Sequence, residues 1–219
     1  MKKDFSILPP CPLFAGIDES QLPTVLSCLD AVEKAYPRGT AIWKAGDPAL
    51  RIGILLQGRA QVVSEDVFGN RSILGEIVPG ELFGEAFACA GAPRIPVGVT
   101  AQADSAVLFV DFRKVLAACA PSCQFHHQLV ENMVRILAEK NRMLNQKIRY
   151  LSKRTTREKL LAYLSDQAKA AGSRTFTIPF RRQELADFLC VERSAMSAQL
   201  GQLRREGVLD FDKSTFRLL

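Results

Sequence analysis

The sequence predicts an α+β fold with three parts: an N-terminal antiparallel β-barrel of jelly-roll type, a long helix and a C-terminal winged helix-turn-helix. Three observations lead to this prediction. Short apolar segments alternate with glycine-containing turns up to about residue 112, one long stretch then has helical periodicity, and the basic C-terminal third alternates helix and strand signals. We therefore expect domains at residues 1–120, 121–152 and 153–219.

Composition narrows the class of protein. The chain has 219 residues, of which 47% are hydrophobic, enough for one large domain or two smaller ones. No apolar run approaches the roughly 18 residues that a membrane span needs, and the N-terminus lacks the apolar centre of a signal peptide. We therefore expect a cytoplasmic protein without a membrane partner.

Histidine is scarce, because the chain contains only His126 and His127. Ser/His/Asp triads, HExxH zinc sites and histidine acid–base catalysis are therefore disfavoured. No other acid–base or phosphate-transfer motif is evident, so we expect that the protein is not an enzyme.

Turn signals divide the barrel region into short strands. They fall at 37–39, 45–48, 57–59, 68–70 and 79–80, and the segments 52–56, 60–63 and 106–110 between them are apolar or alternating. Many short strands with glycine at the turns are typical of an antiparallel barrel or sandwich. Residues 21–29 predict a short helix at one end.

Residues 121–151 predict one helix, because they contain neither glycine nor proline after Pro121. One stripe has the alternating spacing of three and four residues that is typical of a two-helix coiled coil, and its single asparagine would fix the register. We predict a homodimer through this seam: Val130, Val134, Leu137, Asn141, Leu144 and Ile148.

A second stripe on the same helix, Phe125, Leu129, Met133, Ile136 and Met143, is expected to pack on the barrel. Two apolar stripes need two partners, which favours the dimer over a single buried helix within a monomer. The monomer remains the alternative interpretation.

Charge is concentrated in the C-terminal third. Residues 147–219 contain 15 Lys+Arg and 8 Asp+Glu, a net charge of +7, while the rest of the chain sums to −1. A basic module beside a neutral one is typical of a nucleic-acid binder with a separate regulatory part. A solvated basic face is the alternative.

The order of elements in this third predicts a winged helix-turn-helix. Thr155 and Glu158 form a capping-box pattern that starts a helix, which ends near Gly172. The remaining signals are a strand at 175–180, a helix at 182–189, a turn at 190–192, a helix at 193–205, and a hairpin of 208–211 with 216–218.

The second helix of this motif predicts the DNA contacts. Met196, Leu200 and Leu203 would face the core, so that the opposite face meets DNA with Arg193, Ser194, Ser197 and Gln199. We further predict contacts from Arg182 and Gln183 at the start of the first helix and from Arg204 and Lys213, the last two to phosphate.

Two motifs resemble the Crp/Fnr family of bacterial transcription regulators. Residues 182–200 resemble the family's helix-turn-helix, and Pro79-Gly80-Glu81-Leu82-Phe83-Gly84-Glu85 resembles the start of its phosphate-binding cassette. The resemblance covers essentially the whole chain. It implies a homodimer on a palindromic operator in duplex DNA, a small-molecule effector sensed in the barrel, and RNA polymerase as a partner if the protein is an activator.

The cassette departs from the family pattern. By resemblance Gly84, Glu85 and Arg94 would hold a cyclic nucleotide, but Ile95 and Pro96 follow where a hydroxyl residue is expected. The site thereby loses a hydroxyl and a backbone N–H. We predict that cyclic AMP is not the effector, whose identity the sequence leaves unknown; the alternative is a Gly-Glu turn that only shapes the barrel.

The second helix of the motif, which would be the recognition helix, also departs from the family pattern. Ser194 stands where the family commonly has glutamate and Ala198 where it commonly has arginine, so the operator sequence cannot be carried over.

The cysteines leave a redox or metal signal open. Cys11 and Cys28 are too far apart for the tight cluster of the family's iron–sulfur oxygen sensors. Cys119 and Cys123, one helical turn apart, are candidates for a metal or iron–sulfur group or for a reversible disulfide. The alternative is that the cysteines are buried structural thiols.

These observations favour an effector-responsive, sequence-specific DNA-binding regulator. The alternative is a constitutive DNA-binding protein whose ligand-free barrel serves only dimerisation. Histidine scarcity counts against a third reading, an enzyme that uses the barrel pocket.

Overall fold

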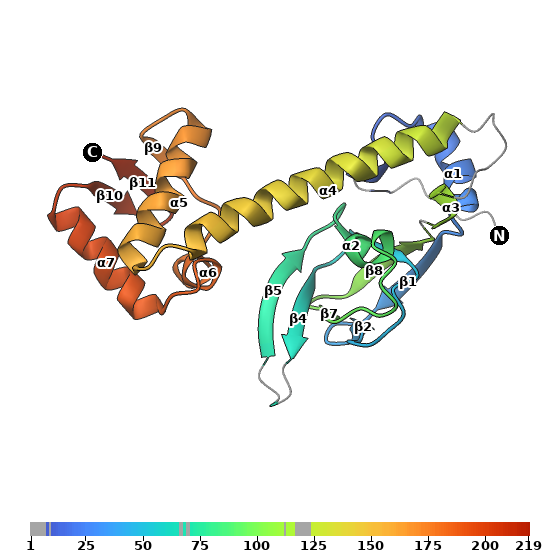
Figure 1. Cartoon of the computed structure of the whole chain (residues 1–219), viewed down its shortest axis with the longest axis horizontal. Coiled ribbons are helices and arrows are strands. Elements are labelled where there is room, and N and C mark those ends of the chain that lie inside the picture. The colour runs from blue at the N-terminus through green and yellow to red at the C-terminus, as the bar shows by residue number, and fades with distance from the viewer. Residues whose placement is uncertain (1–7, 9, 66–67, 69–70, 112, 117–123) are drawn as a thin grey trace. The chain divides into compact units, whose positions relative to one another are not determined.

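The computed structural model describes residues 8, 10–65, 68, 71–111, 113–116 and 124–219 (Figure 1). The chain divides into two compact units, Met1–Ala138 (unit 1) and Glu139–Leu219 (unit 2). The division falls within helix α4 (Gln124–Leu151), which is coloured yellow in Figure 1.

Unit 1 is built on two four-stranded antiparallel sheets. Their strand orders are β1-β8-β3-β6 and β2-β7-β4-β5. The strands are β1 (Val32–Tyr36), β2 (Ala41–Trp43), β3 (Ile52–Gln57), β4 (Ala60–Glu65), β5 (Arg71–Ile77), β6 (Leu82–Phe83), β7 (Gly98–Ala101) and β8 (Ser105–Val110).

The two sheets pack face to face, because side chains from both share one buried cluster. Leu55, Phe83 and Phe109 come from the first sheet, and Ile42 and Val99 come from the second. This double sheet confirms the predicted jelly-roll-like architecture. The predicted apolar segments at 52–56, 60–63 and 106–110 all lie in strands.

Gly58 shows why the turns of this unit need glycine. It joins β3 to β4 with a φ of +90°, and a Cβ there would lie 2.4 Å from the carbonyl oxygen of Asp104. A side chain would be both strained and in collision. The turn predicted at 57–59 is therefore confirmed.

Short helices complete unit 1. They are η1 (Pro12–Phe14), η2 (Glu19–Gln21), α1 (Leu22–Cys28), α2 (Glu85–Cys89) and α3 (Arg113–Leu116). The helix α1 confirms the one predicted at 21–29.

The first half of α4 packs on unit 1, as predicted for the second stripe. Leu129 and Met133 are buried in a cluster with residues of α1 and β8, and Phe125 and Ile136 are partly buried against it. Met143 is the exception: it is 58% exposed and lies in the part of α4 that belongs to unit 2. The prediction that Met143 packs on the barrel is therefore wrong.

Asn132 adds a polar anchor that the periodicity did not reveal. It is buried, and its Nδ2 donates to the carbonyl oxygens of Leu13 and Ala15 at 2.9 and 2.8 Å. These bonds satisfy two backbone acceptors beside the apolar cluster. They fix the N-terminal segment to α4.

Unit 2 has the predicted order of elements. They are α5 (Thr156–Ala171), β9 (Thr175–Thr177), α6 (Arg182–Phe188), α7 (Arg193–Arg205), β10 (Leu209–Asp212) and β11 (Thr215–Leu218). The three strands form an antiparallel sheet in the order β10-β11-β9.

Local signals explain where these elements begin and end. The capping box is formed: Thr155 Oγ1 accepts from the N–H of Glu158 at 3.2 Å, and the Glu158 carboxylate accepts from the N–H of Thr155 at 3.1 Å. The strand predicted to reach Phe180 ends at Thr177. Pro179 has no N–H to continue the ladder, which is the physical reason for this correction.

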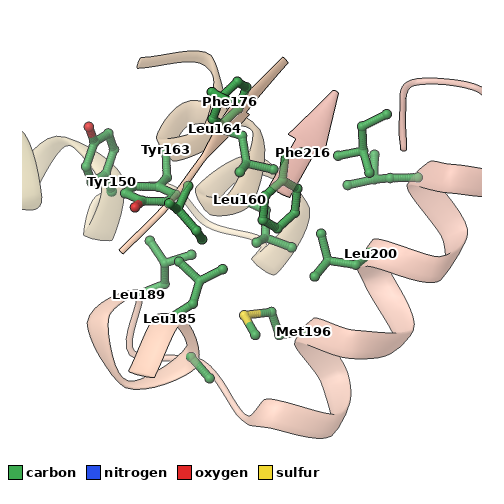
Figure 2. Packing of buried hydrophobic residues seen from close by; sticks show 14 residues of the cluster. Tyr150, Leu160, Tyr163, Leu164, Phe176, Leu185, Leu189, Met196, Leu200 and Phe216 are labelled. Carbon is green, nitrogen blue, oxygen red and sulfur yellow. The ribbon is translucent and has the colours of Figure 1, made fainter. Parts of the chain in front are cut away.

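The core of unit 2 holds the two motif helices together (Figure 2). Met196 and Leu200 project from α7 toward the centre, where Leu185 and Leu189 meet them. Phe216 of β11 is also fully buried there. Burial at this density fixes the inner face of α7 and leaves its other face for contacts outside the unit.

The last turn of α4 is tied to α5 through Asp166. The Tyr150 hydroxyl donates to Asp166 Oδ2 at 2.9 Å, and Gln146 and Arg149 reach the same carboxylate oxygen. Burial and the neighbouring Asp166 raise the pKa of Tyr150 to about 12. Tyr150 therefore stays a neutral hydrogen-bond donor at any physiological pH.

Candidate nucleic-acid interface and effector site

The turn between α6 and α7 is held by three specific features. Ala186 is fully buried and lets the helices approach closely, and its carbonyl accepts from the N–H of Val191 at 3.0 Å. Lys159 Nζ donates to the carbonyl oxygens of Leu189 and Cys190 at 3.2 and 3.4 Å. These bonds satisfy carbonyls at the end of α6 and so fix the start of α7.

Glu192 caps the N-terminus of α7, which the sequence did not reveal. Its carboxylate accepts from the N–H of Ala195 at 2.7 Å and from the Ser194 hydroxyl. The bond from Ser194, and then those from the backbone, lower the pKa of Glu192. Ser194 is thus occupied as a capping partner, while the neighbouring Arg193 is exposed.

The other predicted residues of α7 divide into two groups. Ser197 is exposed, as are Arg193 and Ser194, whereas Met196 and Leu200 are buried. Gln199 is half-buried, and its amide nitrogen is buried without a hydrogen-bond partner in the described part of the chain. Its DNA contact stays a prediction and would require the side chain to leave this position.

The start of α6 packs on the hairpin. The Arg182 guanidinium lies over the ring of Phe211 at 4.6 Å and over that of Phe216 at 5.2 Å. Burial lowers the pKa of Arg182. Through these cation–π contacts, Arg182 positions α6 against the hairpin. Gln183 is exposed and donates to Asp187 at 2.8 Å.

The hairpin of β10 and β11 forms the wing. Arg204 is paired with Asp210 at 2.7 Å and lies 5.3 Å from the Phe211 ring centroid, so it braces the wing against α7. Lys213 stands at the tip with a φ of +50° and is exposed. Among the described residues it has no ion-pair partner, unlike Arg204.

Further exposed cations extend this basic surface. Arg181, Arg205 and Arg217 are exposed, and within the described ranges none of their guanidinium groups forms an ion pair. No sequence motif singles out Arg181 or Arg217. Their exposure next to the motif elements is the signal that identifies them.

The cassette residues of unit 1 lie on two separate segments. Gly84 is the N-cap of α2 and has a φ of +78°, and the adjacent Glu85, the first residue of the helix, is buried. Arg94 is exposed, and its guanidinium donates to the carbonyl oxygen of Gly46 at 2.7 Å. Its backbone pairs with Pro48 in an isolated bridge. Arg94 is thus engaged by the loop that follows β2.

Trp43 occupies the space in front of Gly84. A Cβ on Gly84 would lie 2.3 Å from the Trp43 ring. The same ring packs on Phe83 and Phe109, with centroid distances of 4.8 and 5.8 Å. The interior beside the cassette is therefore filled with aromatic side chains, which motif matching could not show because Trp43 comes from a distant strand.

Three apolar residues of the predicted dimer seam are exposed. Val134, Leu144 and Ile148 are 60%, 61% and 61% exposed. Asn141 is also exposed and accepts from Asn145 at 2.9 Å. Val130 and Leu137 are instead partly buried against the core of unit 1. An exposed apolar stripe that continues from a buried one is typical of an oligomer interface.

The candidate metal site is not formed by the described cysteines. Cys119 and Cys123 lie outside the described residues. Of the others, Cys11 is buried, Cys28 and Cys89 are half-buried, and Cys190 is exposed. Within the described ranges, no group of three His, Cys, Asp or Glu side chains lies close enough together to hold a metal ion.

Among the helices in the described ranges, none combines the length and the apolar character that a membrane span requires.

Comparisons with known proteins agree with this geometry. Residues 33–122 match the family model of the cyclic nucleotide-binding domain, and residues 158–219 match that of the Crp-like helix-turn-helix domain.

The names of two similar proteins are those of a transcriptional activator and of a cyclic AMP receptor protein. Transcriptional activator protein FnrL of Cereibacter sphaeroides is 24% identical over 80% of this chain and 71% of its own length. The cyclic AMP receptor protein of Thermus thermophilus is 25% identical over 93% and 90%.

A solved structure shows the same fold. That of the c-di-GMP responsive global regulator CLP of Xanthomonas campestris superposes with a TM-score of 0.62 at 18% identity, covering 92% of this chain and 99% of that one. Two domain models in the expected order, regulators aligned over most of the chain and the observed winged helix-turn-helix lead to one conclusion: this chain belongs to the Crp/Fnr family of transcription regulators.

Proposed function

We propose that the protein acts as a homodimer that binds a palindromic operator in duplex DNA and responds to an effector sensed by unit 1. The observation that carries this proposal is the two-sided character of α7. Met196, Leu200 and Leu203 are fully buried, while Arg193 and Ser197 in its first turns are exposed. This is the arrangement that a recognition helix needs to enter the major groove.

Each predicted cation has a different task in this proposal. Arg193, at the exposed N-terminal end of α7, is the candidate for a base edge or a phosphate. Lys213 at the wing tip contacts phosphate, because it is exposed and without an ion-pair partner among the described residues. Arg182 and Arg204 act first by holding α6, α7 and the wing in register.

The dimer forms through α4. Val134, Leu144 and Ile148 expose apolar surface at heptad spacing, and Asn141 lies within the same stripe. Burying this surface against a second copy would remove it from water, and paired asparagines would set the register. Two copies of α7 would then read two half-sites.

Cyclic AMP is a poor effector for this chain. Ile95 and Pro96 supply neither a hydroxyl nor a second backbone N–H beside Arg94, whose guanidinium already donates to Gly46. Trp43 fills the space before Gly84, where a phosphate would need the backbone. An anion that is buried with few hydrogen-bond donors loses more free energy of hydration than it regains from those hydrogen bonds.

The signal is therefore another small molecule in unit 1, or a redox, metal or iron–sulfur event at Cys119 and Cys123. The protein carries out no enzymatic reaction, works in the cytoplasm, and contacts RNA polymerase if it activates transcription. These proposals are supported by the similarity of the chain to proteins that are named as transcription regulators.

Selection from a random duplex library tests this proposal. Full-length protein is used alone, with cyclic AMP, and under reducing and oxidising conditions. We expect an enriched inverted repeat with half-sites about 10 base pairs apart. The absence of an enriched palindrome in every condition would contradict it, and equal enrichment in all of them would favour the constitutive alternative.

A further inference from the structure

Unit 1 contains a pocket that is separate from the Gly84, Glu85 and Arg94 cassette. It lies between β1 and β2, which are the edge strands of the two sheets, and has a volume of about 530 Å³. Residues of β1, β2 and β8 and of the loop after β2 line it. Those that matter for its chemistry are Tyr36, Trp43, Phe109, Lys34, Arg51 and Asp47.

Aromatic rings form one wall of the pocket. Tyr36 and Phe109 meet edge to face with centroids 6.3 Å apart, and Trp43 lies 5.8 Å from Phe109. Val32 and Ile42 continue this apolar lining. Such a wall suits an aromatic or branched apolar group, because burying it releases water from both surfaces.

Two cations and one carboxylate line the rest of the pocket. Lys34 is exposed and has no ion-pair partner in the part of the chain that the structure describes. Arg51 is half-buried and uses one nitrogen to donate to the carbonyl oxygen of Asp30 at 2.9 Å. A guanidinium has five N–H donors, so further donors remain for a ligand. Asp47 accepts from the N–H of Lys44 at 2.8 Å.

These side chains carry a net charge of +1 from two cations and one anion. A single negative charge therefore suits the pocket better than two. The apolar lining offers few partners for the hydroxyl groups and the polar base of a nucleotide, which would stay unpaired at a cost. A carboxylate on an apolar body meets both conditions.

We propose that this pocket binds a small monocarboxylic acid with an aromatic or branched apolar body, and that this acid is the effector of the regulator. The effector role rests on the function proposed above, whereas the binding itself does not. Trp43 links the pocket to the cassette segment, because its ring also lies against Gly84 at the start of α2.

The chain offers a built-in reporter for this proposal, because Trp43 is its only tryptophan. Full-length protein is titrated with phenylacetate, 4-phenylbutyrate and 4-methylpentanoate while Trp43 emission is recorded, and the matching neutral amides are titrated in parallel. We expect a saturable change with at least one acid and about tenfold weaker binding of its amide, since the charge-assisted hydrogen bonds are lost.

Two variants locate the binding. Arg51→Gln should weaken it about tenfold, because it removes the half-buried cation from the pocket. Arg59→Gln is the matched control: Arg59 is exposed, pairs with Glu76 on the other sheet and does not line the pocket, so binding should not change. Unchanged binding by Arg51→Gln, or equal weakening by both variants, would overturn the proposal.

The remaining outcomes are equally decisive. No saturable change with any acid, or equal affinity for acid and amide, would overturn the proposal. DNA selection on the same preparation separates a failure of the pocket proposal from a failure of the proposed regulatory function. Enriched DNA without acid binding contradicts only the pocket, while acid binding without enriched DNA contradicts the regulatory function. If both occur, operator affinity must change when the acid is added.

Discussion

The two units contrast in how their functional surfaces arise. In unit 2 the exposed and buried faces of α7 come from residues three and four positions apart on one helix, so the spacing along the chain already determines the interface. In unit 1 the environment of Gly84 is set by Trp43, which comes from the other sheet. A local motif predicts the first kind of surface and can only suggest the second.

The largest effect should come from breaking the core that presents α7. The side chain of Phe216 in β11 is fully buried in the core of unit 2 (Figure 2), so Phe216→Ala removes a large side chain and leaves a cavity. We expect about 3 to 5 kcal/mol of destabilisation, measured by urea denaturation. DNA binding should fall with the folded fraction. Stability within about 0.5 kcal/mol of wild type would show that this core does not support the motif.

The next effect concerns the dimer. Leu144→Asp places a charge in the seam and should weaken dimerisation by about 3 kcal/mol, more than a hundredfold. Met143→Asp is the matched control, because Met143 is equally exposed on the same helix but lies off the seam. Light scattering over a dilution series should give a monomer for the first variant and a dimer for the second. Two dimers would contradict the seam.

A third test separates base reading from phosphate binding. Arg193→Ala should lower affinity for the selected operator by about 1 to 3 kcal/mol and relax specificity at one position. Lys213→Ala should weaken binding to all sequences alike and reduce the salt slope by about one. Fluorescence anisotropy against operator and scrambled DNA at several salt concentrations measures both. Identical behaviour of the two variants would contradict this division.

The sequence predicted the two units unequally well. In unit 2 the capping box at Thr155, the turn at Cys190 and the hairpin at Lys213 are local features, and each element lies where its signals place it. The exception is β9, which ends at Thr177 and not at the predicted Phe180, because Pro179 lacks the N–H that would continue the ladder.

The misses at the candidate sites have a common physical cause. The Glu192 cap, the Arg182 contact with Phe211 and the burial of Gln199 each depend on a side-chain position that spacing alone does not define. The pocket at Trp43 and Arg51 joins segments from two sheets. Heptad spacing likewise could not show that Val130 and Leu137 pack on unit 1 while Leu144 stays exposed.

The smallest effect concerns the joint between α4 and α5. Burial raises the pKa of Asp166, but the hydrogen bonds from Tyr150 and Gln146 and the charge of Arg149 outweigh it, and the net pKa is lowered. A carboxyl group whose pKa is lower in the folded than in the unfolded state stabilises the fold when it is ionised. This stabilisation is fully present above the unfolded pKa of about 4 and is lost as the pH falls through the folded pKa.

Asp166→Asn should therefore cost about 1 kcal/mol at pH 7 and progressively less below pH 4. Urea denaturation of both proteins across this range measures the difference. A cost that did not shrink in acid would mean that the carboxylate charge is not what stabilises the joint.

The most direct test of the account asks whether α7 reads bases in two symmetric copies. Ser197→Gln changes an exposed residue of α7, and Ser173→Gln, in the exposed turn after α5, is the matched control. Library selection is repeated with both. The account predicts that Ser197→Gln alters the consensus at one position in each half-site, related by the two-fold axis, while Ser173→Gln keeps the wild-type consensus. An unchanged consensus for Ser197→Gln, or a change in one half-site only, would contradict it.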